Sequence, residues 1–370
     1  MKEIDLALSG GGIRAMVFHL GVLRFLAEQQ KMEHIRRISC VSGGSLITGL
    51  IVKEAGMRWP DSSTFLQTIY PALQHKLCNR SLITDMLRQL IRPENYRYLL
   101  SRANILGKAL EKEWGITEKL ADLPRVPEIS FEGTTAENGK RFRFKRDSMG
   151  DYDIGYAEAG HFPLSQALAV SAAFPGGIGP LQLDTRLYQW QHPVGSESSN
   201  RTCPYDSLHL YDGGVYDNLG LEPFFDATSG KPKRKDGFLL VSDAGSPFRA
   251  GFSYGIINPL RLKRVLDITM EQCRSLRIRS LVGYLTQKKG PGAYLWINTT
   301  LSENEALHAF ASAFPTTLRK LTASEFNKLA QYGYLVARLR LRYILDEAAA
   351  QTSQTKVGND VKNYYHIENE

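Results

Sequence analysis

The sequence has few cysteines and no long apolar run. Its four cysteines, at positions 40, 78, 203 and 273, form no CxxC pair or other metal-ligand spacing. No apolar stretch reaches the roughly 18 to 20 residues that would span a bilayer, because Arg14, His19 and Arg24 interrupt the best candidate. The N-terminus does not resemble a secretion signal. We therefore expect a cytoplasmic protein that contacts a membrane only peripherally.

The sequence also lacks a zinc finger, an RNA-binding aromatic signature and a sustained basic helix, so we expect no contact with DNA or RNA. Lysine and arginine, 46 together, exceed the 38 acidic residues, for a net charge of +8. This surplus favours anionic partners such as acidic lipid head groups or nucleotides, but a solvated basic surface without a partner explains it equally well. With 43% hydrophobic residues, the chain can bury a large core.

A serine lies at a predicted turn between a strand and a helix. The apolar run 35–39 leads into residues 40–45 (CVSGGS), and a helical pattern follows from 46 to 55. A tight strand-to-helix turn exposes its serine in a strained conformation, and small neighbours let a substrate carbonyl approach it. Ser42 is therefore the candidate nucleophile.

A glycine loop precedes this turn by one strand-helix unit. A strand at 4–8, a helix at 13–30 and the strand near 35–41 form a βαβ unit with parallel strands, so both loops open at one end of the sheet. The backbone N–H groups of Gly10, Gly11, Gly12 and Gly43 are the candidate oxyanion hole. The alternative is a phosphate-binding loop, although the sequence lacks GxxxxGK[ST] and has Ala15 at the third glycine position of GxGxxG.

The proton acceptor is less obvious. Asp212 follows a predicted strand and precedes Gly213 and Gly214, which would bring its carboxylate to the sheet end that holds Ser42, although Asp-Gly is also common in ordinary turns. A free aspartate has a pKa of about 3.9, so the site would have to desolvate it or hold the serine proton directly. His308 would complete a Ser-Asp-His triad, but its helical context favours a packing or surface role.

A literal GxSxG motif occurs elsewhere, at residues 251–255. Its serine, Ser253, follows no predicted strand and precedes Pro259 rather than a helix start. Ser42 has both a strand and a helix, so context favours Ser42. The first position of the Ser42 turn is Cys40, which fits only if the turn does not require a positive φ there.

In combination, three ordered motifs resemble the patatin-like phospholipases: the loop 10–14 (GGGIR), the elbow 41–45 (VSGGS) and Asp-Gly-Gly at 212–214. The phrases 171–175 (SAAFP) and 314–316 (FPT) are similar to that family too. The predicted fold is a three-layer α/β/α domain over 4–345 with a mostly parallel central sheet. A helical insertion at 57–125 would serve as a cap, a lid or an acyl-chain wall, and a polar tail would follow at 351–370.

The resemblance implies a Ser-Asp dyad without histidine, in which Ser42 forms the acyl-enzyme and Asp212 accepts the proton, with Arg14, Gly213 and Gly214 in support. Implied substrates are acyl esters of membrane phospholipids, with no metal or other cofactor. Similarity to bacterial antiphage effectors adds a cyclic nucleotide as activator and a role in antiviral defence, and it leaves a homo-oligomer open. The alternative, which Cys40 favours, is a non-catalytic lipid- or nucleotide-binding regulatory protein on the same fold.

Overall fold

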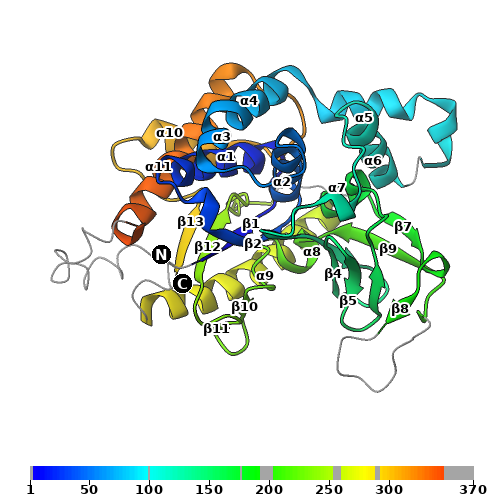
Figure 1. The fold of residues 1–370 in the computed structure, drawn as a ribbon. Helices are drawn as coiled ribbons and strands as arrows, with labels where there is room; N and C mark the ends of the chain where they lie inside the picture. The colour runs from blue at the N-terminus through cyan, green and yellow to red at the C-terminus, as the bar shows by residue number, and fades with distance from the viewer. Residues whose placement is uncertain are drawn as a thin grey trace.

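The computed structural model describes residues 3–98, 101–175, 177–191, 203–252, 260–287 and 292–345. Its centre is an 11-stranded sheet, and helices cover both faces of this sheet (Figure 1). Five neighbouring strands, in the order β13-β12-β1-β2-β3, are all parallel to one another. The predicted three-layer fold with a mostly parallel central sheet is thereby confirmed.

The strands and helices have the following bounds. The strands are β1 (Ile4–Leu8), β2 (Ile35–Cys40), β3 (Glu128–Thr135), β4 (Arg141–Phe144), β5 (Ser148–Asp151), β6 (Gly155–Glu158), β7 (Leu181–Asp184), β8 (Trp190–Gln191), β9 (Ser207–Asp212), β10 (Phe225–Asp226), β11 (Lys231–Pro232), β12 (Phe238–Asp243) and β13 (Gly292–Trp296). The helices are α1 (Gly12–Glu28), α2 (Gly43–Glu54), α3 (Ser62–Thr64), α4 (Tyr70–Asn79), α5 (Leu82–Leu90), α6 (Arg102–Lys112), α7 (Leu164–Ser171), α8 (Gly214–Asp217), α9 (Leu260–Gln287), α10 (Glu305–Ala313) and α11 (Ala323–Leu345), with short 3-10 or π turns between some of them.

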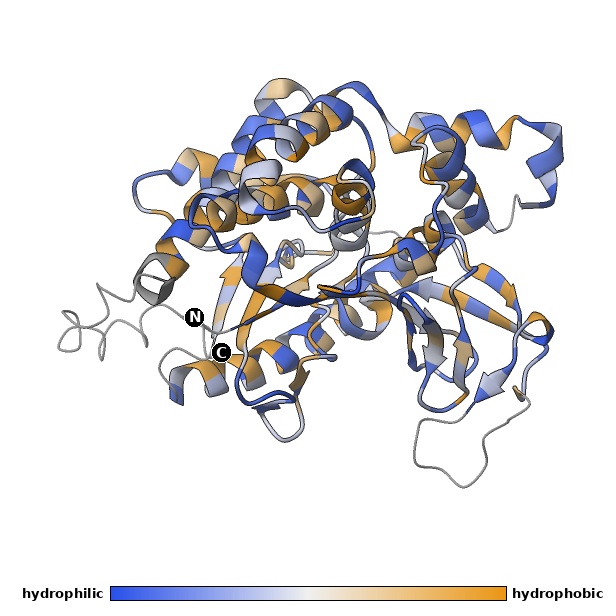
Figure 2. Cartoon of the chain, viewed as in Figure 1, coloured by the Kyte–Doolittle hydropathy of each residue, from blue (hydrophilic) through white to orange (hydrophobic). Residues whose placement is uncertain are grey.

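The parallel strands are apolar because helices cover them from both sides. Every residue of β1 and β12 is buried, as is typical of strands in a parallel sheet. Figure 2 shows the apolar colour concentrated in these strands and in the helices next to them. Helix α1 is buried along most of its length, as is typical of a helix that is apolar on most sides.

The other half of the sheet is antiparallel, which the sequence analysis did not predict. Strands β4, β5, β6 and β8 continue the sheet beyond β3, and each is antiparallel to its neighbour. Strand β4 alternates between partly exposed and buried residues, because successive side chains of a strand point to opposite faces of the sheet. Strand β9 is also antiparallel to β3 and brings β7 with it.

Several predicted elements have shifted ends. Helix α2 begins at Gly43 rather than at residue 46, and α1 covers Gly12–Glu28 rather than 13–30. Within 57–125, the described helices α3 to α6 end at Lys112. Proline, glycine and serine at 191–206 predict a loop, of which residues 192–202 lie outside the described residues, as does the tail at 351–370. Within the described ranges, no helix is both long and apolar enough to cross a bilayer.

Candidate active site

Ser42 has the strained backbone of a sharp strand-to-helix turn. Only two residues separate the end of β2 at Cys40 from the start of α2 at Gly43. Ser42 therefore adopts φ 51° and ψ −116°, a conformation that costs a non-glycine residue on the order of 1–3 kcal/mol. Its N–H donates to Ser171, to the carbonyl oxygen at 3.0 Å and to Oγ at 3.1 Å. These two acceptors hold the elbow in its strained form.

The glycines after Ser42 allow two loops to pack closely. A Cβ atom on Gly43 would lie 2.3 Å from the carbonyl oxygen of Gly12, and one on Gly44 would lie 2.5 Å from that of Leu8. Real Cβ atoms do not approach carbonyl oxygens so closely. The elbow and the glycine loop can therefore lie against each other only because both positions lack a side chain.

Cys40 fits the first position of the elbow without strain. It is the last residue of β2 and pairs in the sheet with Leu8 and Phe131. It is not among the described residues with positive φ. Its buried thiol donates to the carbonyl oxygen of Ser130 at 3.4 Å, and burial raises the pKa of the thiol to about 12. This cysteine is thus a neutral packing residue.

Ser42 and Asp212 meet because two strands run toward each other along the same edge of β3. Strand β2 ends with Cys40 opposite Phe131, while β9 arrives from the other direction and ends with Asp212 opposite Gly133. The two strand ends are therefore two residues apart along β3, or roughly 7 Å. The sequence predicted the meeting, but through a common end of parallel strands rather than through this head-to-head approach.

The Asp212 carboxyl group is buried and carries a strongly shifted pKa. Burial raises the pKa of Asp212 to about 7, although the N–H of Gly214 and the hydroxyl of Ser42, as hydrogen-bond donors to the carboxyl, lower it. The N–H of Gly214 lies 2.7 Å from Oδ1 of Asp212. An acid with a pKa near neutrality is well matched to accept and return a proton at that pH.

Three backbone N–H groups remain available beside this pair. Within the described part of the chain, the N–H groups of Gly11, Gly12 and Gly43 have no backbone acceptor. The φ angles of Gly11 and Gly12 are 146° and 61°, which glycine alone adopts readily. The N–H of Gly10 instead donates to the carbonyl oxygen of Asn218 at 3.1 Å. Gly10 therefore shapes the loop, while the other three N–H groups can face an oxyanion.

Arg14 ties the glycine loop to two distant segments. Its Nε donates to the carbonyl oxygen of Ala244 at 3.0 Å, and its Nη1 donates to that of Phe314 at 2.6 Å. Nη2 is buried without a hydrogen-bond partner among the described residues, and a Cβ on Gly11 would lie 3.0 Å from it. Burial lowers the pKa of Arg14 to about 10, so the side chain keeps a positive charge beside the loop at neutral pH.

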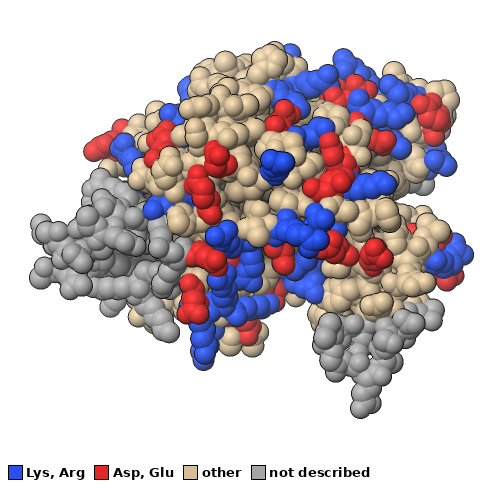
Figure 3. Space-filling view, in the orientation of Figure 1, with Lys and Arg blue, Asp and Glu red and all other residues tan. Residues whose placement is uncertain are grey.

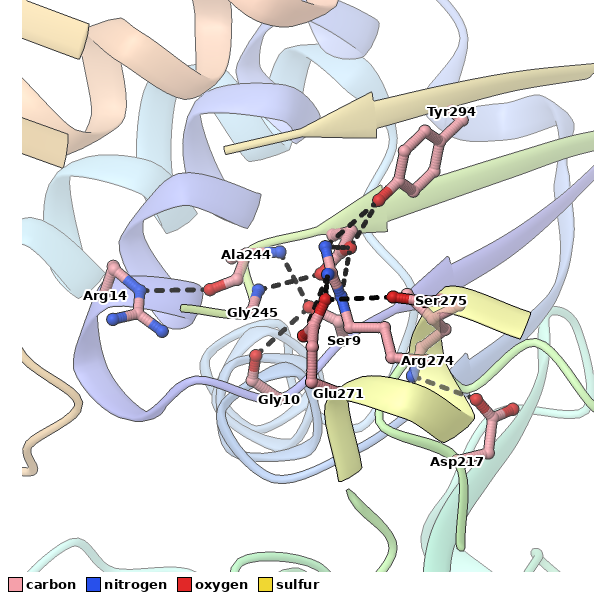
Figure 4. Close-up of polar contacts among 12 residues, drawn as sticks. Ser9, Gly10, Arg14, Asp217, Ala244, Gly245, Glu271, Arg274, Ser275 and Tyr294 are labelled. Carbon is pink, nitrogen blue, oxygen red and sulfur yellow. Dashed lines mark hydrogen bonds and ion pairs between the residues drawn. The ribbon is translucent and has the colours of Figure 1, made fainter. Parts of the chain in front are cut away.

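Behind the loop lies a buried ionic cluster, drawn in Figure 4. Arg274 of α9 donates to Oδ2 of Asp243 through Nη2 at 2.6 Å and through Nε at 3.0 Å. Tyr294 donates to the same oxygen at 2.6 Å, and the N–H of Gly245 donates to Oδ1 at 2.8 Å. The next residue, Ala244, carries the carbonyl that holds Arg14. The cluster therefore fixes the end of β12 against which the glycine loop lies.

The alternative site residues lie elsewhere. His308 Nε2 forms a hydrogen bond with Oδ1 of Asn298 at 3.0 Å, and its ring stacks against Tyr332. These contacts give His308 the packing role that its helical context predicted. Ser253 of the literal GxSxG motif falls outside the described residues.

Three positioning residues were missed by sequence reasoning. Ser171 holds the N–H of Ser42, Asn218 accepts from Gly10, and Thr317 accepts from the N–H of Ile13 at 2.7 Å. Ser171 lies in the SAAFP phrase, whose resemblance was a usable signal. Asn218 and Thr317 had no local signal, because their partners are far away in the sequence.

A family model described as "Patatin-like phospholipase" matches residues 6–225. The chain belongs to the patatin-like phospholipase family. The matched range contains both the Ser42 elbow and Asp212, so the pair lies within the part that the family shares. No curated protein matches the chain.

Several solved structures resemble this chain. Human GIVD cytosolic phospholipase A2 superimposes with a TM-score of 0.56 at 14% identity, over 95% of this chain and 60% of the human one. The same enzyme in complex with methyl gamma-linolenyl fluorophosphonate gives 0.53 at 13% identity, over 95% and 58%. VipD from Legionella pneumophila gives 0.40 at 17% identity, over 93% and 66%. The chain thus spans about three fifths of the human enzyme, with which it shares the fold.

Proposed function

We propose that this patatin-like protein is a lipid acyl hydrolase that cleaves acyl esters of phospholipids with a Ser42-Asp212 dyad. The observation that carries the proposal is the strained Ser42 elbow beside a buried Asp212 whose pKa is raised to about 7. Family membership supports hydrolysis of lipid esters. A phospholipase A2 has a similar fold, which is compatible with the proposed chemistry.

In the first half of the reaction, Ser42 Oγ attacks the ester carbonyl while Asp212 accepts the hydroxyl proton. The N–H groups of Gly11, Gly12 and Gly43 donate to the oxyanion that forms. The tetrahedral intermediate then expels the alcohol, which takes the proton back from Asp212. The acyl group remains on Ser42 as an ester.

In the second half, water attacks this acyl-enzyme and Asp212 accepts a proton from the water. Collapse of the second intermediate releases the fatty acid and returns the proton to Ser42 Oγ. Asp212 alternates between its two protonation states in both halves. A carboxyl group with a pKa near 7 makes both transfers accessible without histidine.

Labelling with a fluorophosphonate tests the proposal directly, since such reagents phosphonylate activated serines. The human phospholipase A2 of similar fold has been solved with a ligand of this class. Wild-type protein should be labelled at Ser42, and Ser42→Ala should neither be labelled nor hydrolyse a phospholipid. Full ester hydrolysis by Ser42→Ala or by Asp212→Ala would refute the dyad.

The second candidate is a regulatory protein that binds a lipid or nucleotide without turnover. Cys40 favoured it at the sequence level, but this cysteine fits the elbow without a positive φ. Activation by a cyclic nucleotide and a role in antiviral defence stay predictions from the family resemblance. Repeating the labelling with and without cyclic nucleotides separates the candidates: labelling that needs a nucleotide supports a switched enzyme, and none under either condition supports the binding protein.

A further inference from the structure

Helix α5 buries Leu82 and part of Met86 against the core, yet it also leaves a row of apolar residues on its outer side. Its polar residues Asp85 and Gln89 are buried, while the side chains of Ile83, Leu87 and Ile91 point outward. Leu87 is 56% exposed and Ile91 is 74% exposed. Helices of a globular protein ordinarily bury the apolar face and expose the polar one.

Hydrogen bonds on the buried side fix this orientation. Oδ2 of Asp85 accepts from Nε1 of Trp114 at 2.9 Å. Nε2 of Gln89 donates to Glu113 at 3.0 Å, and the carbonyl oxygen of Gln89 accepts from Asn95 at 2.9 Å. Turning the helix over would leave these buried groups unpaired, which costs about 1–3 kcal/mol for each group. The outward apolar face is therefore held in place by the rest of the insertion.

The exposed residues form one continuous stripe. Ile83, Leu87 and Ile91 recur every four residues, so they lie above one another on the helix surface. The side chain of Tyr96, just beyond the helix, is exposed as well. A row of exposed apolar side chains along one helix face is a candidate contact site.

The segment that carries the stripe has a surplus of basic residues. Residues 80–98 contain four arginines but only two carboxylates, and one of these carboxylates, Asp85, is buried. Arg88, whose side chain is 61% exposed, pairs with Asp85 at 2.9 Å, and Arg92 pairs with Glu113 at 3.6 Å, so part of the positive charge is already compensated. Figure 3 shows several blue side chains, with red ones beside them, where Figure 1 labels α5 and α6. An apolar helix face flanked by arginine is typical of helices that lie in the interface of an anionic bilayer.

The stripe begins next to the catalytic loop. The N–H of Ile83 donates to the carbonyl oxygen of Leu318 at 3.4 Å. The preceding residue, Thr317, accepts from the N–H of Ile13, at the start of the helix that follows the glycine loop. A two-residue segment thus separates the first turn of α5 from the proposed oxyanion hole. A surface bound to α5 would lie on the active-site side of the molecule.

We propose that the α5 face formed by Ile83, Leu87 and Ile91 is the surface through which this protein docks on an anionic lipid bilayer. The inference rests on the proposed function in that the bilayer is also the source of the ester substrate. The surplus of arginine in residues 80–98 favours an anionic bilayer as the partner, because arginines complement acidic head groups. Docking of the stripe would hold the Ser42 site against the membrane surface.

Vesicle flotation with the Ser42→Ala protein tests this docking without any turnover. The vesicles are phosphatidylcholine alone, and phosphatidylcholine with about one third phosphatidylglycerol. The double variant Leu87→Gln/Ile91→Gln keeps side chains that suit a helix but removes the apolar contact. Leu187→Gln is the matched control, since Leu187 is 75% exposed on a different element. Thermal unfolding of each variant verifies folding.

The expected result is binding to the anionic vesicles that falls tenfold or more in the double variant and stays within twofold in Leu187→Gln. Equal binding of all three proteins, or no binding to anionic vesicles, would overturn the proposal. So would a dimer in light scattering that only the double variant dissociates, because a second copy would then cover the face. Hydrolysis by the unaltered protein is measured separately, so a failed dyad and a failed docking surface are told apart.

Discussion

Replacing Asp212 by asparagine should abolish catalysis and make the protein more stable at alkaline pH. The asparagine can keep Oδ1 as acceptor for the N–H of Gly214, which lies 2.7 Å from that atom in the native protein. It cannot take up the serine proton. We expect hydrolysis to fall by a factor on the order of 10² to 10⁴, the usual contribution of a general base.

The stability gain follows from the cost of burying the charge. A pKa raised from 3.8 to about 7 corresponds to about 4 kcal/mol, at about 1.4 kcal/mol per pKa unit. Below about pH 4 the carboxyl is protonated in both folded and unfolded chains, so it costs nothing. As the pH rises through 7 the unfolded chain has already lost the proton and the folded chain must lose it too, so the full cost appears above pH 7.

Thermal unfolding of the wild type and Asp212→Asn at pH 8 and pH 4.5 measures this difference. For 370 residues, a gain of about 4 kcal/mol at pH 8 raises Tm by about 5 °C, since the entropy of unfolding is about 2 cal/mol/K per residue. At pH 4.5 the gain shrinks to about 1 kcal/mol. Asp147→Asn, whose side chain is 70% exposed, should leave Tm within about 1 °C at both pH values. A Tm change in Asp212→Asn that is equal at both pH values would refute the reasoning.

Three further predictions concern the same site and its support. Ester hydrolysis by the wild type should rise with pH through about 7 and then level off, because only ionised Asp212 accepts a proton; a rate that falls over pH 6 to 8 contradicts this. Gly43→Ala should lower the hydrolysis rate at least tenfold, because the added Cβ would lie 2.3 Å from a carbonyl oxygen. Its control, Gly283→Ala in α9, has open space around the new Cβ and should gain about 0.5–1 kcal/mol of stability in denaturant unfolding. Arg274→Met should cost about 3–5 kcal/mol of stability because it removes the counter-ion of the buried Asp243 carboxylate. Lys263→Met, which breaks an exposed pair on the same helix, should cost less than about 1 kcal/mol; equal losses would mean that the buried cluster does not stabilise the fold.

The parts of the fold that sequence predicted are those with local signals. The βαβ unit and the elbow at Ser42 combine continuous apolar strands with glycine-rich turns, so each element carries its own pattern. The short apolar run at 293–296 (AYLW) likewise forms the edge strand β13. Asp212 was placed correctly at the end of a strand because an apolar run and an Asp-Gly turn adjoin there.

The parts that sequence did not predict depend on partners far away in the chain. The head-to-head approach of β9 to β2 rests on the pairing of Gly133 with Asp212, and no local pattern encodes such a pairing. The N–H of Gly10 was expected to line the oxyanion hole, but it donates a hydrogen bond to the carbonyl oxygen of Asn218 instead. In α5 the polar residue Asp85 is buried because it accepts a hydrogen bond from Trp114, so hydropathy alone did not indicate which side of the helix faces outward.

The hydrogen bond between Arg14 and Phe314 joins residues 300 positions apart, and this separation has a consequence during synthesis. A nascent chain that has emerged from the ribosome up to Asp212 already contains both Ser42 and the Asp212 carboxylate. The carbonyl groups of Phe314 and Thr317, which brace the glycine loop, are about 100 residues behind, or roughly 5 to 20 seconds of translation. We therefore expect the growing polypeptide to be inert toward the cell's own lipids until this late segment arrives.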